Sequence, residues 1–217
     1  MTGPTQTSPI ARPRRQPPRI VPVVGLVALV LAAALAAWYL TGRRRLIFSN
    51  DLAAPIWVAI GQRAPVSLEP GVVQTLDLPA GSVVVQWNLA RPLSANQRPM
   101  GEEVRGSAVI RERRGTIRRS ATIRQSGMAY FAPLITNATE GLLRIVVNAG
   151  LEGAVDCGCA VRPGAERVFV GYYRLYRNST VQARDSVGRS ATFRDLGPSV
   201  TAADGLVGLR FESKDFR

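Results

Sequence analysis

The residues with the most distinctive chemistry in this sequence are Cys157 and Cys159, which are separated only by Gly158. In a β-strand, residues i and i+2 point to the same face, so both sulfur atoms would lie together. Two thiolates favour Cu(I) over harder ions, but they would leave a zinc ion undercoordinated. The pair is therefore interpreted as a structural or buried pair, a copper(I) site that uses Cys157 and Cys159 as metal ligands, or a redox-active pair.

Histidine is absent from all 217 residues. This absence removes imidazole general bases, imidazole metal ligands and Ser-His or Cys-His nucleophiles. We find no phosphate-binding glycine loop or nucleophile elbow, and Asp156 is the only carboxylate beside a reactive group. The sequence therefore predicts a protein that is not an enzyme and has no cofactor, with copper as the alternative.

The surroundings of the cysteines resemble a known family over a short segment. A Pro-Gly turn at 163–164 and an apolar segment follow the pair, and the whole region follows a single apolar N-terminal segment. In these features the chain resembles the copper-delivery assembly factors of cytochrome oxidase, which implies copper binding by the two thiols. That family carries an aromatic residue between and after its cysteines, where this chain has Gly158 and Ala160. Copper delivery is therefore kept as the alternative function.

A second candidate site is a run of arginines. Between residues 105 and 124 there are seven arginines and a single acid, Glu112. A turn at Arg114-Gly115 would fold 104–124 into a basic hairpin that attracts lipid, an anionic envelope polymer or an acidic protein. Because no aromatic residue lies among the arginines to stack bases, nucleic acid is not an expected partner. The alternative is an edge hairpin whose charge only prevents aggregation. The anion-binding candidates are Arg111, Arg113, Arg114, Arg118, Arg119 and Arg124.

Three of the five tyrosines lie in the segment 172–176. On a strand, Tyr172 and Tyr176 would share one face with Arg174, which is an arrangement that could stack a ligand. Sandwich domains also use tyrosines as amphipathic packing residues, and we expect that structural role here.

The elements that would position these residues begin with an apolar segment at 20–40, which has no charged side chain. A helix of this length, at about 1.5 Å per residue, spans roughly the 30 Å of a bilayer core. Trp38 and Tyr39 end the segment, and residues 41–45 form a basic juxtamembrane stop. We expect a single-pass signal-anchor helix. A cleaved signal peptide is the alternative, because Ala34-Leu35-Ala36 has the small-residue pattern of a cleavage site.

Residues 1–19 contain four arginines, five prolines and no acid, which predicts a disordered tail. Such a basic tail favours the cytoplasm, while long downstream domains translocate largely regardless of charge. The expected location is the cell membrane, with the N-terminus cytoplasmic, the C-terminal domain extracytoplasmic and lipid headgroups as a partner. The net charge is +13, and 27 arginines stand against one lysine, a bias typical of a GC-rich bacterial gene.

Beyond residue 46, short apolar segments rich in β-branched residues alternate with Gly and Pro turns. This pattern predicts a mainly β fold, an immunoglobulin-like β-sandwich over 46–217 with a possible sub-boundary near 91–103. Pro-Gly recurs at 70–71 and 163–164, but turn chemistry alone explains that, so we predict no internal repeat. The expected strands are 55–60, 72–78, 82–89, 107–113, 116–123, 142–148, 167–176, 180–184, 190–196 and 206–212.

Taken together, the sequence predicts a membrane-anchored binding or scaffolding module of the cell envelope. The alternative is a thiol-based Cu(I) carrier or redox protein.

Overall fold

The computed structural model describes residues 20–40, 44–95, 97–112, 115–122, 124–125, 128–197, 202 and 204–217. The chain divides into two units, Met1–Gly42 and Arg43–Arg217. In the first unit, helix α1 runs from Ile20 to Leu40. The described part of the chain contains no helix with both the length and the apolar character needed to cross a membrane. The predicted tail at 1–19 lies outside the described residues.

The described residues of the second unit form β-strands and one 3-10 turn, so the prediction of a mainly β fold is confirmed. Its elements are β1 (Arg44–Asn50), β2 (Ile56–Ile60), β3 (Val66–Leu68), β4 (Val73–Leu78), β5 (Val83–Leu89), β6 (Arg105–Ile110), β7 (Thr116–Ala121), β8 (Arg124–Gln125), β9 (Met128–Ala138), β10 (Leu143–Val147), β11 (Val155–Val161), β12 (Val168–Phe169), β13 (Tyr173–Arg174), β14 (Val181–Arg184), β15 (Ser190–Phe193), β16 (Leu206–Glu212) and η1 (Ser213–Asp215).

Each of the ten predicted segments contains a strand, but 167–176 is not continuous. It is split into β12 and β13 around Gly171, whose φ of +102° does not belong to an extended strand. Strands β1, β3, β8, β9 and β11 were not predicted from the sequence. Their patterns hide them, because β1 begins with two arginines, β9 contains Pro133 and β11 contains Gly158.

The N-terminal boundary of the β unit was predicted two residues too late. Arg44 and Arg45, expected in the basic juxtamembrane stop, form the start of β1. The Arg44 side chain is only 6% exposed. Its guanidinium donates hydrogen bonds to the carbonyl oxygens of Pro79 at 3.0 Å, of Gly81, and of Arg111 at 2.6 Å. This arginine therefore belongs to the sandwich, where its hydrogen bonds connect the β4–β5 turn to the residue that follows β6.

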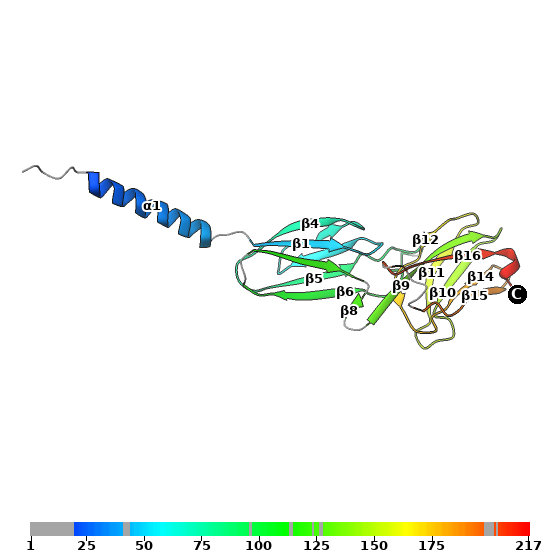
Figure 1. Cartoon of the computed structure of the whole chain (residues 1–217). Coiled ribbons are helices and arrows are strands. Elements are labelled where there is room, and N and C mark those ends of the chain that lie inside the picture. The colour runs from blue at the N-terminus through cyan, green and yellow to red at the C-terminus, as the bar shows by residue number, and fades with distance from the viewer. Residues whose placement is uncertain are drawn as a thin grey trace, which may run out of the picture. The chain divides into compact units, whose positions relative to one another are not determined.

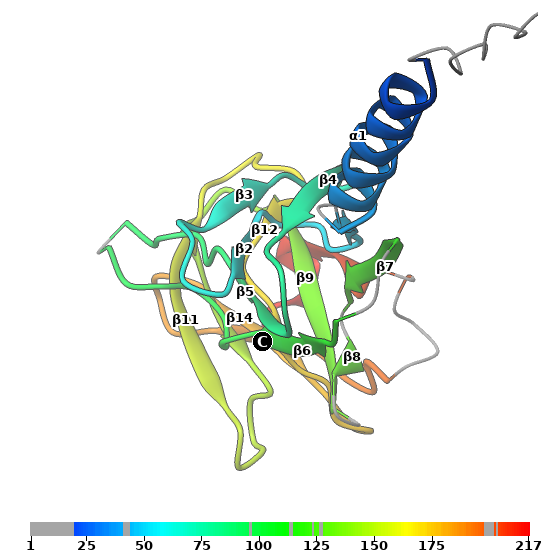
Figure 2. The ribbon, with the colours of Figure 1, turned by 90° about the vertical axis from the view of Figure 1, so that its left-hand side faces the viewer.

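The first half of the unit, residues 44–121, consists of two packed sheets. One has the order β4-β1-β7, with β1 antiparallel to β4 and parallel to β7. The other has the order β3-β2-β5-β6 and is antiparallel throughout. Figure 2 shows β4 and β7 on one side of this half and β3, β2 and β5 on the other. Alternate residues of both sheets point inward and form a buried apolar core, which gives the sandwich.

The second half, residues 128–217, repeats this topology. Strand β9 is antiparallel to β12 and parallel to β16, as β1 is to β4 and β7. The second sheet has the order β11-β10-β14-β15, which matches β3-β2-β5-β6 strand for strand. In Figure 1 the strands of the two halves gather in separate groups within the β unit. The expectation of no internal repeat is therefore wrong at the level of structure.

The immunoglobulin-like strand order is also wrong. In an immunoglobulin domain, the second and third strands lie in different sheets. Here β2 pairs with β3 in one sheet, and β10 pairs with β11 in the other half. The confirmed statement is the coarser one: the β unit is a sandwich-type arrangement of several sheets.

Two buried asparagines mark the repeat most clearly. The Asn50 side chain donates to the carbonyl oxygens of Ala54 and Leu68, both at 2.9 Å, and accepts from the amide of residue 52 at 3.0 Å. Asn137 does the same with Gly141 at 2.8 Å, Val161 at 2.9 Å and the amide of residue 139 at 2.9 Å. The backbone carbonyl of Asn50 accepts a hydrogen bond from the amide of Gly71, and that of Asn137 accepts one from the amide of Gly164. Both glycines belong to Pro-Gly turns. The recurring Pro-Gly therefore has an architectural role beyond turn chemistry.

The division between halves follows the two apolar cores. One core draws mainly on residues 46–121 and the other on 131–216, so the chain passes between them after β7 rather than at 91–103. The halves are joined by Tyr172, which is fully buried in the first core although it comes from the second half. Its hydroxyl accepts from the Ala53 amide at 2.9 Å and donates to the Asp204 carbonyl oxygen at 2.8 Å. The backbones of Gly101 and Gly171 meet so closely that neither position has room for a Cβ atom.

Candidate functional site

The most distinctive exposed surface is the outer side of the sheet β3-β2-β5-β6, which we call the Trp57 face. Inward residues of β2 fill the core, so Trp57 and Ala59 point to solvent. The indole of Trp57 is 44% exposed. Strand register places side chains in two rungs across this face, one of Ser67, Trp57, Asn88 and Arg105 and the next of Ala59, Gln86 and Ser107.

Except for Ser67, the residues of these rungs line an open pocket of about 560 Å³. Polar side chains from β5 and β6 surround the indole, and Pro65 and Glu103 complete the rim. The side chains of Glu103 and Arg105 are both solvent-exposed. Their charged groups lie 3.7 Å apart, so the two charges compensate each other. At the base, a Cβ on Gly106 would collide with the ring of Trp87, and that ring is 9% exposed. A glycine at 106 thus allows Trp87 to pack beneath the pocket.

The equivalent face of the second half has a different chemistry. Trp57 lies seven residues after Asn50, and Arg144 lies seven residues after Asn137. Arg144 pairs with Arg184, where Trp57 pairs with Asn88. An exposed indole is therefore a property of one half and not a requirement of the topology.

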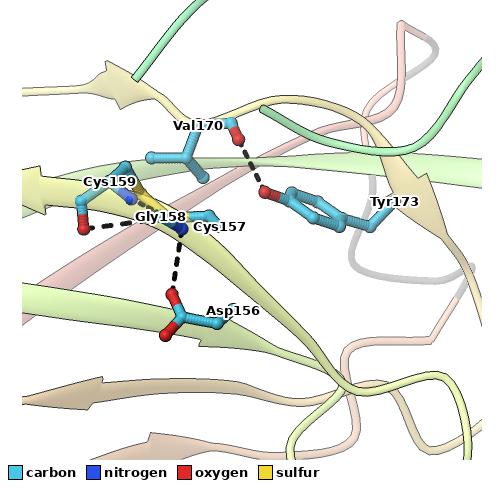
Figure 3. Close-up of a disulfide and its surroundings, with 6 residues drawn as sticks. All are labelled: Asp156, Cys157, Gly158, Cys159, Val170 and Tyr173. Atoms are coloured by element: carbon cyan, nitrogen blue, oxygen red, sulfur yellow. Dashed lines mark hydrogen bonds between the residues drawn. A yellow bond between two sulfur atoms is a disulfide. The ribbon is translucent and has the colours of Figure 1, made fainter. Parts of the chain in front are cut away.

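The two cysteines lie together on β11, and the structure joins them in a disulfide with a Cα–Cα distance of 5.2 Å (Figure 3). Cys157 is 4% exposed and packs in the second core, while Cys159 is half-buried. Gly158 has a φ of +62°, which its lack of a Cβ permits, and its amide donates to Asp156 Oδ1 at 2.9 Å. In this oxidised state neither sulfur is a thiolate, so Cu(I) binding would require prior reduction.

A second pocket, of about 490 Å³, lies beside the disulfide. Arg98 and Arg144 line it together with both cysteines and Asp156. Arginine side chains near a sulfur favour the thiolate form once a disulfide is reduced. No cluster of three or more His, Cys, Asp or Glu residues suited to a metal ion occurs in the described ranges.

The predicted basic hairpin does not form. Strand β6 pairs with β5, whereas β7 pairs with β1 in the other sheet, so the two predicted strands belong to different sheets. Arg111, Arg118 and Arg119 are exposed. Arg124 begins β8, and its side chain is not described, while Arg113 and Arg114 lie outside the described residues. Anion binding by these arginines stays a prediction, without the hairpin that was expected to gather them.

The tyrosines of 172–176 serve the packing of the β unit. Burial raises the pKa of Tyr172 to about 12 and also raises the pKa of Tyr173. The Tyr173 hydroxyl donates to the Val170 carbonyl oxygen at 2.8 Å (Figure 3). Both hydroxyls stay protonated at neutral pH and hold backbone segments in place.

Sequence reasoning missed Trp57 as a functional candidate. Residues 55–60 were predicted as a strand, but their sequence could not show which strands flank β2. Gln86 and Asn88 lie 29 and 31 residues after Trp57 in the sequence, and only the register brings their amides beside the indole.

Comparisons with known proteins leave the family open. No protein-family model matches the chain, and no curated protein matches its sequence. Any function for the chain therefore rests on its own geometry.

Proposed function

We propose that the chain is a membrane-anchored, non-enzymatic binding module of the cell envelope, with its β unit outside the cytoplasm. The observation that carries the binding role is the pocket on the Trp57 face. Aromatic side chains accompanied by a few convergent polar groups are typical of ligand sites. The indole exposes apolar surface to water, and a bound ligand would cover it.

Two features support the proposed location. Residues 20–40 carry no charge over a length that matches a bilayer core when helical. The disulfide between Cys157 and Cys159 favours an oxidising compartment, where such bonds persist. In this arrangement the basic residues at 1–19 would contact anionic lipid headgroups on the cytoplasmic side.

Reporter fusions after residue 217 test the location. One reporter folds only outside the cytoplasm and the other fluoresces only inside it. We expect activity from the first alone, and retention of the chain in membranes washed at alkaline pH. A control chain that lacks residues 20–40 should lose both properties. A cytoplasmic C-terminus, or release of the full chain by the wash, would contradict the proposal.

A redox role of the disulfide is a second candidate, favoured by one observation. The half-buried Cys159 lines a pocket that also contains Arg98 and Arg144. These cations would stabilise thiolates formed by reduction, which is the state that a Cu(I) carrier also needs. The thiol measurements in the Discussion separate this candidate from a purely structural bridge.

A further inference from the structure

We infer that the Trp57 face binds an uncharged carbohydrate chain, with one sugar ring stacked on the indole of Trp57. The inference deepens the proposed binding role and rests on it, since it names the ligand class of the same pocket. It does not depend on where the protein is located.

The first argument comes from the exposed indole. The outer side of a sandwich sheet needs no large aromatic side chain, because the core is filled from the inner side. Trp57 nevertheless stands near the middle of this face, between Ser67 on β3 and Asn88 on β5. An indole offers a flat apolar surface, and one face of a sugar ring is likewise a flat array of C–H groups. Stacking the two removes apolar area from water on both sides.

The second argument comes from the polar neighbours. Asn88 and Gln86 carry amide groups that both donate and accept hydrogen bonds, and Ser107 carries a hydroxyl that does the same. Sugar hydroxyls need partners of this dual kind around the edge of the ring. Neighbouring strands are about 4.8 Å apart, so side chains on adjacent strands can reach adjacent hydroxyl groups of one ring.

The third argument comes from charge. Arg105 and Glu103 line the same pocket and compensate each other at 3.7 Å. A strand of nucleic acid or another polyanion would need a groove of one positive sign. The matching face of the second half, with Arg144 opposite Arg184, comes closer to that description. The Trp57 face therefore suits a neutral ligand.

The size of the pocket agrees with this ligand class. Its volume of about 560 Å³ falls in the usual range of small-ligand sites, roughly 300–1,000 Å³. Because the pocket is open on the sheet surface, a chain of sugars can run across the strands without threading through the protein. A short oligosaccharide is thus the natural probe.

The test titrates the purified full chain with defined probes and follows tryptophan fluorescence and calorimetry. The probes are tetramers of N-acetylglucosamine and of β-1,4-linked glucose, with a single-stranded DNA oligomer for comparison. The detergent must lack a sugar headgroup. We expect saturable binding of at least one saccharide and none of the DNA. Trp57→Ala should weaken that binding by at least about tenfold, since it removes the stacking surface and aromatic residues often carry much of the binding energy.

Arg144→Ala is the matched control, because it removes an exposed side chain at the equivalent position of the other half. It should leave saccharide binding unchanged. Gln86→Ala provides a second variant that keeps the indole, with an expected loss of a few-fold. Circular dichroism verifies that each variant is folded.

Three results would overturn the inference: no saccharide binding at millimolar probe concentrations, equal binding by wild type and Trp57→Ala, or DNA binding lost in Trp57→Ala. The last result would leave the proposed binding role intact while refuting the carbohydrate assignment. Loss of the proposed location in the reporter test would leave the pocket assignment standing.

Discussion

The two buried asparagines provide a direct test of the structural repeat. Asn50 and Asn137 are both fully buried, and each donates two side-chain hydrogen bonds and accepts a backbone amide. Each such bond contributes about 1 kcal/mol net, and unsatisfied buried partners cost about 1–3 kcal/mol more. Replacing either asparagine by alanine should therefore lower the free energy of unfolding by about 3–5 kcal/mol. That loss is a large fraction of the stability of an ordinary domain, which is about 5–15 kcal/mol.

The placement of tryptophans lets one assay read the halves separately. Trp57 and Trp87 lie in the first half, and residues 128–217 contain no tryptophan. In a Trp38→Phe background, fluorescence during urea unfolding reports the first half, while far-ultraviolet circular dichroism reports both. Asn50→Ala should shift the fluorescence midpoint directly. Asn137→Ala should shift the urea midpoint of the dichroism signal most. It should shift the urea midpoint of fluorescence only if the two halves unfold cooperatively.

The reasoning would be refuted by a loss below about 1 kcal/mol in either variant with an unchanged urea dependence. Such a result would mean that the hydrogen bonds do not hold the β-strands at that position. A large loss at one asparagine with none at the other would refute the reasoning for the second position, because its hydrogen bonds would then contribute little to stability. Ser49→Ala, beside Asn50 but with its hydroxyl bonded to the exposed Asp51, is the matched control and should cost little.

Three further predictions concern the junction between the halves and the disulfide. A Cβ at residue 101 would lie 2.7 Å from the Tyr172 carbonyl oxygen, so Gly101→Ala should cost about 2–4 kcal/mol in urea unfolding. Gly71→Ala, also at positive φ but in open space, should cost only about 1–2 kcal/mol; equal losses would contradict the close junction. Because burial raises the pKa of Tyr172 from 10.0 to about 12, the unfolded chain releases this proton first, so stability should fall as pH rises through that interval. Tyr172→Phe should flatten this fall measured by unfolding at pH 9 to 12, and an unchanged slope would refute it. Reduction of the disulfide by dithiothreitol yields two thiols, and anaerobic titration should then show whether the chain binds one Cu(I) with Cys157 and Cys159. A structural bridge predicts no stoichiometric copper binding and a lowered unfolding midpoint after reduction, and the Cys157→Ser/Cys159→Ser variant should reproduce that midpoint.

Most of the strands could be predicted from the sequence, but little of their pairing into sheets could be. Short apolar segments rich in β-branched residues and bounded by turns revealed strands such as β5 within 82–89, because these signals depend only on local sequence. Pairing between strands depends on contacts far apart in the chain. For that reason residues 104–124 were predicted as one basic hairpin, although β6 and β7 belong to different sheets. The same limitation concealed the candidate site, whose indole and amides are neighbours only through register.

The repeat also explains why its sequence signal was so weak. The two halves retain an asparagine and a Pro-Gly turn, since these groups form hydrogen bonds with backbone atoms at equivalent positions of both halves. Outward side chains do not have to satisfy buried backbone atoms, so they can differ between the halves, as Trp57 and Arg144 do. Inward apolar positions tolerate many exchanges of similar volume. The two halves therefore share the apolar pattern of their strands but not the same amino acids at those positions. A duplicated sandwich can therefore keep its framework through a few polar contacts while its two outer faces acquire separate binding properties. It follows that exchanging the outward residues of the Trp57 face with those of the equivalent face, which carries Arg144, should transfer binding to the second half without loss of the fold. Exchanging the framework residues should instead disrupt the fold.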